Sequence, residues 1–149
     1  MKVFISHKKE DADIAFEVLN SLKSYGVDAY LDLLEGNLVL KGEELTRHIR
    51  KRLNECTDLL VVISEKTKYS WWVPFEVGMS AQKDFPTVNY LKAGVDLPSY
   101  LEYWPRLKDT NDLKKYVDTK TIVQKSLTET FEIAESSTEM FYKELKAKL

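Results

Sequence analysis

The chain has 149 residues, of which 44% are hydrophobic and 31% charged, a composition typical of one folded soluble domain. Its 22 basic and 24 acidic residues give a net charge of −2, which excludes binding to nucleic acid or to an anionic membrane through bulk charge. The single cysteine excludes an internal disulfide, and the longest apolar run, residues 59–63, is far shorter than the ~18 residues that a membrane span needs.

The N-terminal segment and the potential metal ligands indicate the expected class of protein. The N-terminus has too short an apolar run for a signal peptide. Neither His7 nor His48 has a second histidine or a cysteine at metal-ligand spacing. We therefore expect a cytoplasmic domain with no metal and no cofactor.

The first part of the chain predicts a strand, a helix and a second strand. Residues Lys2–Ser6 form a short apolar run typical of a strand. Residues 11–25 carry apolar side chains at helical spacing, and Gly26 is expected to end this helix because glycine readily adopts the left-handed conformation of a helix C-terminus. Residues 27–31 predict the second strand, which opens into a loop over 32–42.

The middle of the chain continues this alternation. Residues 43–56 place apolar side chains on one face of a helix, and Asp58–Ile63 has the uninterrupted apolar core of a strand buried on both faces. Residues 70–83 predict another helix, which we expect to begin near Trp71 because a proline three residues later is tolerated only near the first turn. Residues 86–91 predict a fourth strand.

The last part of the chain predicts short elements followed by a long helix. We expect a short helix near 98–101, an edge strand near 104–107 and a short helix over 109–117. Ser126 and Glu129 match a capping box, in which the two side chains satisfy each other's backbone N–H groups at a helix start. Apolar residues follow at alternating steps of three and four, which predicts one long amphipathic helix over about 126–148.

The alternation of strands and helices predicts an α/β fold with a parallel sheet covered on both faces, because a right-handed connection between parallel strands is long enough to hold a helix. We expect a single domain over residues 1–149, with a core over about 1–120 and the C-terminal helix added to it. The binding sites of such folds lie outside the carboxyl ends of the strands.

Trp72 and Glu76 are the strongest candidates for chemistry. They are four residues apart and therefore share one face of the predicted helix. An indole offers a flat face on which a nucleobase or a nicotinamide ring can stack, and a carboxylate can stabilise positive charge on a sugar. Those are the needs of N-glycosidic bond cleavage, whose transition state resembles an oxocarbenium ion. By spacing alone, a core tryptophan beside a solvated glutamate is the commoner arrangement.

Several short segments occur in a characteristic order: Val-Phe-Ile-Ser at 3–6, a strand over 27–32 that ends in aspartate, Gly-Glu-Glu-Leu at 42–45, Leu-Val-Val-Ile-Ser at 60–64, and Ser-Trp-Trp-Val-Pro-Phe-Glu at 70–76. This order resembles the Toll/interleukin-1 receptor (TIR) domain family, in particular the stand-alone bacterial proteins of Thoeris-like defence systems. The resemblance implies a flavodoxin-like three-layer fold with a parallel five-stranded sheet.

The resemblance also implies an activity. Enzymatic TIR domains act as NAD+ nucleosidases or ADP-ribosyl cyclases: they cleave the nicotinamide–ribose bond and form ADP-ribose or a cyclic ADP-ribose-type signal. Glu76 matches their catalytic glutamate. The residues that match substrate-binding positions are Ser6, His7, Lys8, Asp32 and Trp72. NAD+ is then a substrate and not a cofactor.

The implied partners, beside NAD+, are other copies of the chain through TIR–TIR contacts and a downstream effector that senses the product in antiviral defence. Two alternatives stay open. The first is a non-enzymatic adaptor that acts through TIR–TIR association, with Glu76 incidental. The second is an enzyme similar to the nucleoside 2-deoxyribosyltransferases, whose related fold also uses a carboxylate at the anomeric carbon.

Overall fold

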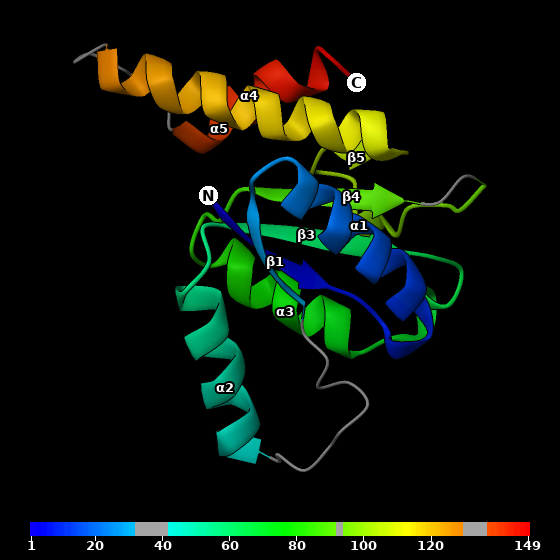
Figure 1. The fold of residues 1–149 in the computed structure, drawn as a ribbon. Helices are drawn as coiled ribbons and strands as arrows, with labels where there is room; N and C mark the ends of the chain where they lie inside the picture. Colours follow the sequence, from blue (N-terminus) through cyan, green and yellow to red (C-terminus); the bar gives the residue numbers. More distant parts are fainter. Residues whose placement is uncertain (32–41, 92–93, 130–136) are drawn as a thin grey trace.

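The elements of the fold follow the expected alternation (Figure 1). The computed structural model describes residues 1–31, 42–91, 94–129 and 137–149. The strands are β1 (Lys2–Ser6), β2 (Asp28–Leu31), β3 (Asp58–Ile63), β4 (Thr87–Leu91) and β5 (Arg106–Leu107). The α-helices are α1 (Ala12–Ser24), α2 (Gly42–Asn54), α3 (Trp72–Ala81), α4 (Thr110–Glu129) and α5 (Ser137–Lys146). Short 3-10 turns lie in the connections: η1 (Lys9–Asp11), η3 (Thr67–Tyr69) and η4 (Ser99–Leu101).

The five strands form one sheet in the order β2-β1-β3-β4-β5, and each neighbouring pair is parallel. This confirms the predicted α/β fold with a parallel five-stranded sheet of flavodoxin type. The chain moves outward from β1 to β2 and then returns to the other side of β1 for β3. At such a switch point the connections after two neighbouring strands diverge and leave a crevice at their carboxyl ends. The fold therefore directs attention to the ends of β1 and β3.

Helices cover both faces of the sheet and make three layers (Figure 1). On one face, α1, α4 and α5 form a core cluster with Val3, Ile5, Leu60 and Val62. On the other face, α2 and α3 form a second cluster with Phe4, Leu59, Val61 and Ile63. Because successive residues of a strand face opposite sides, Ser6 faces the same side as Phe4, toward α2 and α3.

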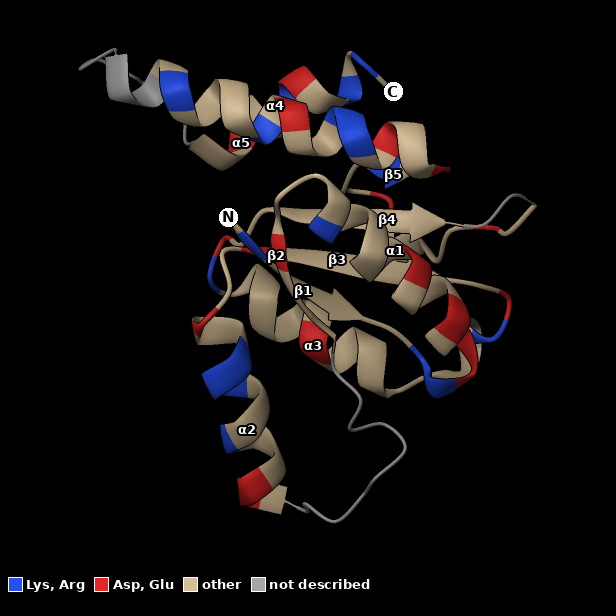
Figure 2. Cartoon of the chain, in the orientation of Figure 1, with Lys and Arg blue, Asp and Glu red and all other residues tan. Residues whose placement is uncertain are grey.

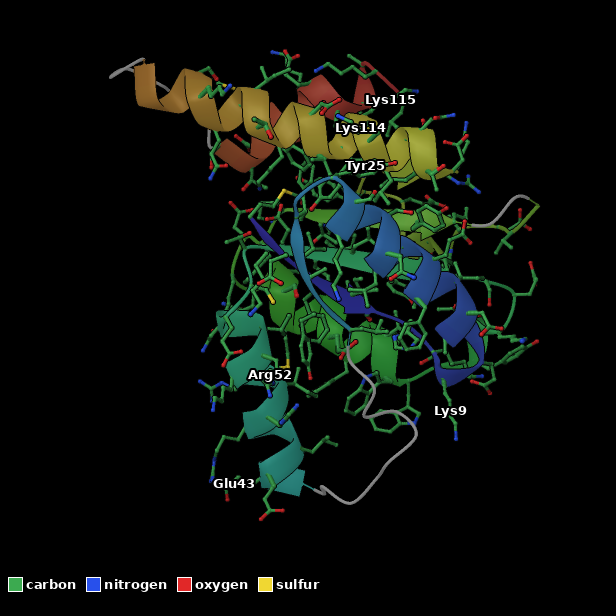
Figure 3. The ribbon with its side chains drawn as sticks, in the orientation of Figure 1. Lys9, Tyr25, Glu43, Arg52, Lys114 and Lys115 are labelled. Carbon is green, nitrogen blue, oxygen red and sulfur yellow. The ribbon has the colours of Figure 1, made fainter. Side chains whose placement is uncertain are left out.

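The first helix ends as its sequence predicts. Gly26 has a φ of 74°, and the Val27 N–H donates to the Leu22 carbonyl at 3.0 Å, which closes the helix at a left-handed glycine. Tyr25 then lies beneath α4 (Figure 3), with the Lys114 Nζ 5.7 Å from the centroid of its ring. The end of α1 is thus fixed against the C-terminal part of the fold.

The C-terminal part differs from the prediction of one helix over about 126–148. Helix α4 is longer than predicted and already contains Ser126, and a separate helix, α5, begins at Ser137. The Ser126 hydroxyl donates to the Val123 carbonyl at 2.9 Å inside α4, so the predicted capping box is wrong. Apolar steps of three and four fit one helix or two, and here α5 packs on α4, with the ring centroids of Phe141 and Tyr116 5.8 Å apart. Residues 130–136 lie outside the described part. No helix in the described ranges is long and apolar enough to cross a bilayer.

Candidate active site

Two polar side chains from distant parts of the chain meet at the carboxyl end of β1. Ser6 is the last residue of β1, and Glu76 lies in the second turn of α3. Glu76 is the single charged residue of that helix, which Figure 2 draws as one red segment in a tan ribbon. The Ser6 hydroxyl donates a hydrogen bond to Glu76 Oε2 at 2.5 Å, and both residues are fully buried. The structure therefore brings together two of the residues predicted for the site.

The start of α3 determines where Glu76 points. The helix begins at Trp72, which places Pro74 in the first turn as predicted. The Ser70 hydroxyl accepts the Val73 N–H at 3.3 Å, which satisfies one of the donors exposed at a helix start. From this start, Trp72 and Glu76 both fall on the buried face of the helix. The prediction that they share one face is confirmed.

The indole of Trp72 lies in the core. It is 1% exposed, and its ring centroid is 5.3 Å from that of Trp71, edge to face, and 6.3 Å from that of Phe75. The expectation that Trp72 offers a flat face to a stacking ligand is therefore not met in this structure, because protein atoms cover the ring. The exposed indole at the start of α3 belongs to Trp71, which is 65% accessible to solvent. The commoner arrangement, a core tryptophan beside a solvated glutamate, is half correct, because Glu76 is buried as well.

The Glu76 carboxylate lies among buried apolar side chains, which strengthens its electrostatic interactions. The buried apolar residues on this side of the sheet include Phe4, Val61, Ile63, Val73 and Val77. A buried carboxylate is costly unless a hydrogen bond stabilises it, and Ser6 provides one. In such a low-dielectric layer a negative charge interacts strongly with any positive charge that develops nearby. A cation would be stabilised beside this carboxylate once a rearrangement exposed it, because Glu76 has no exposed surface in this structure.

His7 and Lys8, which follow Ser6, have different surroundings. The side chain of His7 is buried, with 3% of its surface exposed. The Lys8 ammonium donates to the Lys66 carbonyl at 3.2 Å and lies 3.4 Å from the Glu10 carboxylate. In return, the Lys66 ammonium donates to the Glu10 carbonyl at 3.3 Å. Lys8 thus ties the loop after β1 to the loop after β3. Its predicted contact with the substrate would have to replace or share these bonds.

The polar residues after β3 include Ser64, which ends one of the motifs named above, and Thr67, which was missed. The Ser64 N–H donates to Thr67 Oγ1 at 2.9 Å, and the Lys66 N–H donates to Ser64 Oγ at 3.0 Å. The Thr67 hydroxyl in turn donates to the buried Asp11 carboxylate at 3.2 Å. The signal in the sequence is the Ser and Thr three residues apart directly after an apolar strand, a spacing typical of side-chain-stabilised turns. The remaining predicted residue, Asp32, lies outside the described part of the chain.

A hollow of about 360 Å³ opens between these loops, and half of the residues that line it are acidic. Its lining residues are Glu10, Asp11, Asp13, Ile14, Ser64, Glu65, Lys66 and Val95. A larger hollow of about 510 Å³ lies at the opposite, amino edge of the sheet. Glu76 lines neither of these two hollows. Among the described residues, no group of three or more His, Cys, Asp and Glu side chains is placed to hold a metal ion.

Comparison with known proteins identifies the family. A sequence model of the TIR domain matches residues 3–122, which is most of the chain. The chain belongs to the TIR domain family. The resemblance predicted from the order of the motifs is therefore confirmed, and the buried glutamate of α3 is part of a TIR domain.

Two individual proteins are similar to this chain, one in sequence and one in fold. The "Probable 3' cyclic ADP-D-ribose synthase ThsB'" of Bacillus cereus (strain MSX-D12) is 29% identical over 79 residues, which are 51% of this chain and 41% of that protein. The matched part therefore spans about two fifths of that relative's length. The TIR domains in the structure of the activated Roq1 resistosome directly recognizing the pathogen effector XopQ are similar in fold, with a TM-score of 0.50 and 18% identity over 97% of this chain and 82% of that chain.

Proposed function

We propose that this TIR domain cleaves NAD+ at the nicotinamide–ribose bond, with Glu76 as the catalytic carboxylate. The observation that carries the proposal is the burial of Glu76 at the carboxyl end of β1, where Ser6 donates to it. The similarity to a probable cyclic ADP-ribose synthase supports the choice of substrate. A role in bacterial antiphage defence signalling, with a downstream effector that senses the product, follows from the family resemblance.

The chemistry needs little more than an oriented negative charge. The C1′–N bond breaks heterolytically, and nicotinamide leaves as a neutral molecule with the bonding electron pair. The ribose is left as an oxocarbenium cation, which the ionised Glu76 stabilises. Water, or a hydroxyl or adenine nitrogen of the same ADP-ribose, then attacks C1′, and a water or hydroxyl nucleophile loses its proton. The nucleophile decides between linear ADP-ribose and a cyclic product.

Replacement of the carboxylate tests this proposal. We expect Glu76→Gln to lower NAD+ consumption by ~100-fold or more, because loss of one preorganised electrostatic contact typically costs 10²–10³ in kcat. The matched control is Glu102→Gln, which changes an exposed glutamate and should leave turnover unchanged. Products are separated by chromatography at high protein concentration, so that association does not limit activity. Unchanged turnover by folded Glu76→Gln would remove Glu76 from the mechanism.

A second candidate function is that of an adaptor, which the surface around α3 favours. Three aromatic side chains at the start of this helix are exposed: Tyr69 at 83%, Trp71 at 65% and Phe75 at 39%. Exposed aromatic residues are typical of protein–protein interfaces. They support self-association through TIR–TIR contacts, in line with the fold similarity to the resistosome TIR domains. No NAD+ turnover by the concentrated wild-type protein would favour this adaptor. A parallel incubation with deoxynucleosides tests the deoxyribosyltransferase alternative.

A further inference from the structure

The contact between Ser6 and Glu76 gives Ser6 a different role from the one that the family resemblance implies. The family resemblance assigns Ser6 to the substrate-holding positions. In the structure the residue is fully buried, and its hydroxyl donates to Glu76 Oε2 at 2.5 Å. The hydroxyl has one proton, which it already gives to Glu76, so it has no donor left for a dinucleotide. Its effect on a reaction would pass through Glu76.

The strand pattern shows how specific this contact is. Ser6 faces the same side of the sheet as Phe4, and its neighbour in β3 is Val61. An apolar side chain would suit this layer, because a buried polar group needs a partner to offset its desolvation. The hydrogen bond gives Ser6 an acceptor and gives Glu76 a donor, since the hydroxyl offers one donor and an ionised carboxylate only accepts. A donor–acceptor distance of 2.5 Å is in the range expected for a hydroxyl bonded to a charged acceptor.

The two residues also differ in how firmly the backbone holds them. Glu76 reaches its carboxylate through three rotatable bonds, so its head group can take several orientations. Ser6 has one such bond and lies at the end of a strand that is paired on both sides, with β2 and β3. The serine hydroxyl is therefore a fixed point against which the longer side chain is oriented. A catalytic carboxylate held in one orientation loses less entropy when the transition state forms.

We propose that Ser6 is a positioning residue that orients the Glu76 carboxylate for stabilisation of the sugar cation. This inference rests on the proposed NAD+ cleavage and deepens it. A positioning role predicts that loss of the hydroxyl lowers kcat and leaves KM nearly unchanged. A substrate-binding role predicts the reverse, a raised KM with kcat retained.

Four substitutions of Ser6 and Glu76 test the proposal in the full chain. Ser6→Ala is expected to lower kcat by about 10- to 100-fold with KM within about twofold of wild type, the range expected for loss of a hydrogen bond to a charged group. Ser6→Thr and Ser6→Val form a matched pair of equal shape, of which Thr keeps the hydroxyl. We expect Ser6→Thr to retain activity and Ser6→Val to behave like Ser6→Ala. Adding Ser6→Ala to Glu76→Gln should cause no further loss, because the two residues act as a unit.

The outcomes separate this inference from the proposed function. Equal kcat in the Thr and Val variants, a Ser6→Ala variant that changes KM alone, or an additive loss in the double variant would each overturn the positioning role. If the added methyl group unfolds both members of the matched pair, as circular dichroism would show, the kcat and KM of the smaller Ser6→Ala variant decide the question. If the Glu76→Gln variant turns over NAD+ at the wild-type rate, the proposed function itself is wrong.

Discussion

A buried carboxylate lies at the amino ends of the strands and another lies at their carboxyl ends, and the two have different partners. These two ends of the sheet are called its amino edge and its carboxyl edge below. At the amino edge, Asp58 begins β3 and is fully buried, and Lys120 of α4 places its ammonium 2.8 Å from the Asp58 carboxylate. At the carboxyl edge, Glu76 is held by the neutral hydroxyl of Ser6. A lysine brings a positive charge to its partner, whereas a hydroxyl donates a hydrogen bond and carries no charge of its own. The comparison separates a carboxylate that secures the fold from one that is suited to chemistry.

Other groups at the amino edge support its structural role. The Thr57 hydroxyl donates to Asp58, and Lys120 lies with its Nζ 4.9 Å from the centroid of the Phe141 ring. Burial, and then the negative charge of Asp58, raise the pKa of Tyr116 well above its ordinary value, so this phenol stays neutral. These contacts join β3 to α4 and α5. We therefore expect substitutions here to change the free energy of unfolding before they change catalysis.

The largest effect on stability is expected for Asp58→Asn. This variant leaves the Lys120 ammonium without its counter-charge in a mostly buried position, which typically costs about 3–5 kcal/mol. Urea denaturation followed by circular dichroism measures the loss, with the exposed Asp96→Asn as control. In the double variant Asp58→Asn/Lys120→Met, removal of both charges should recover most of the stability. A double variant as unstable as the sum of the single variants would contradict a paired-charge role.

An effect of similar size is expected beside Glu76, from the two adjacent tryptophans. Trp72→Ala removes a ring that is 1% exposed and should cost about 3–5 kcal/mol of unfolding free energy. Trp71→Ala removes a ring that is 65% exposed and should change stability by less than about 0.5 kcal/mol. The same urea titrations compare the two variants. Equal losses would show that the burial of Trp72 does not support this edge of the sheet.

A smaller effect is expected from alkaline pH. Burial raises the pKa of the Cys56 thiol from 9.0 to about 11 and that of the Tyr142 phenol from 10.0 to about 12. Because the pKa of each group is higher in the folded than in the unfolded chain, folding favours the neutral form. The stabilisation from Cys56 is complete below about pH 9 and is lost as the pH rises through about 11.

Thermal melts of wild type and Cys56→Ala test this pH dependence. Between about pH 8.5 and pH 10, below the range in which Tyr142 contributes fully, the melting temperature of the wild type should fall more steeply than that of the variant. The variant itself provides the control for every other group that titrates in this window. Parallel curves for the two proteins would mean that the thiol is not desolvated by folding.

The sequence predicts the sheet well because strand signals are local. The apolar runs Lys2–Ser6 and Asp58–Ile63 coincide with β1 and β3, and Gly26 ends α1 where expected. Each of these predictions depends on neighbours within a few residues. The C-terminal helices were predicted less well, since periodic apolar residues fit a continuous helix and a helix pair alike.

The site could be predicted only in part, because its decisive contact is not local. The spacing of Trp72 and Glu76 shows that they share a helix face, but spacing does not say whether that face is open or covered. The bond from Ser6 to Glu76 joins residues 70 positions apart, and no periodic pattern reports it. Lys8 was predicted from its place after β1, whereas its partners come from the loop after β3. Membership of a loop is therefore a weaker guide to contacts than the topology of the sheet.

The most direct test measures both properties on the two carboxylate variants in parallel: NAD+ turnover per folded molecule, and the free energy of unfolding. Glu76→Gln should lose ~100-fold or more of its turnover and stay folded, and Asp58→Asn should lose about 3–5 kcal/mol of stability while its folded fraction turns over NAD+ at the wild-type rate. Folded Glu76→Gln protein that consumes NAD+ as fast as the wild type would contradict a catalytic role for the carboxylate at this edge of the sheet.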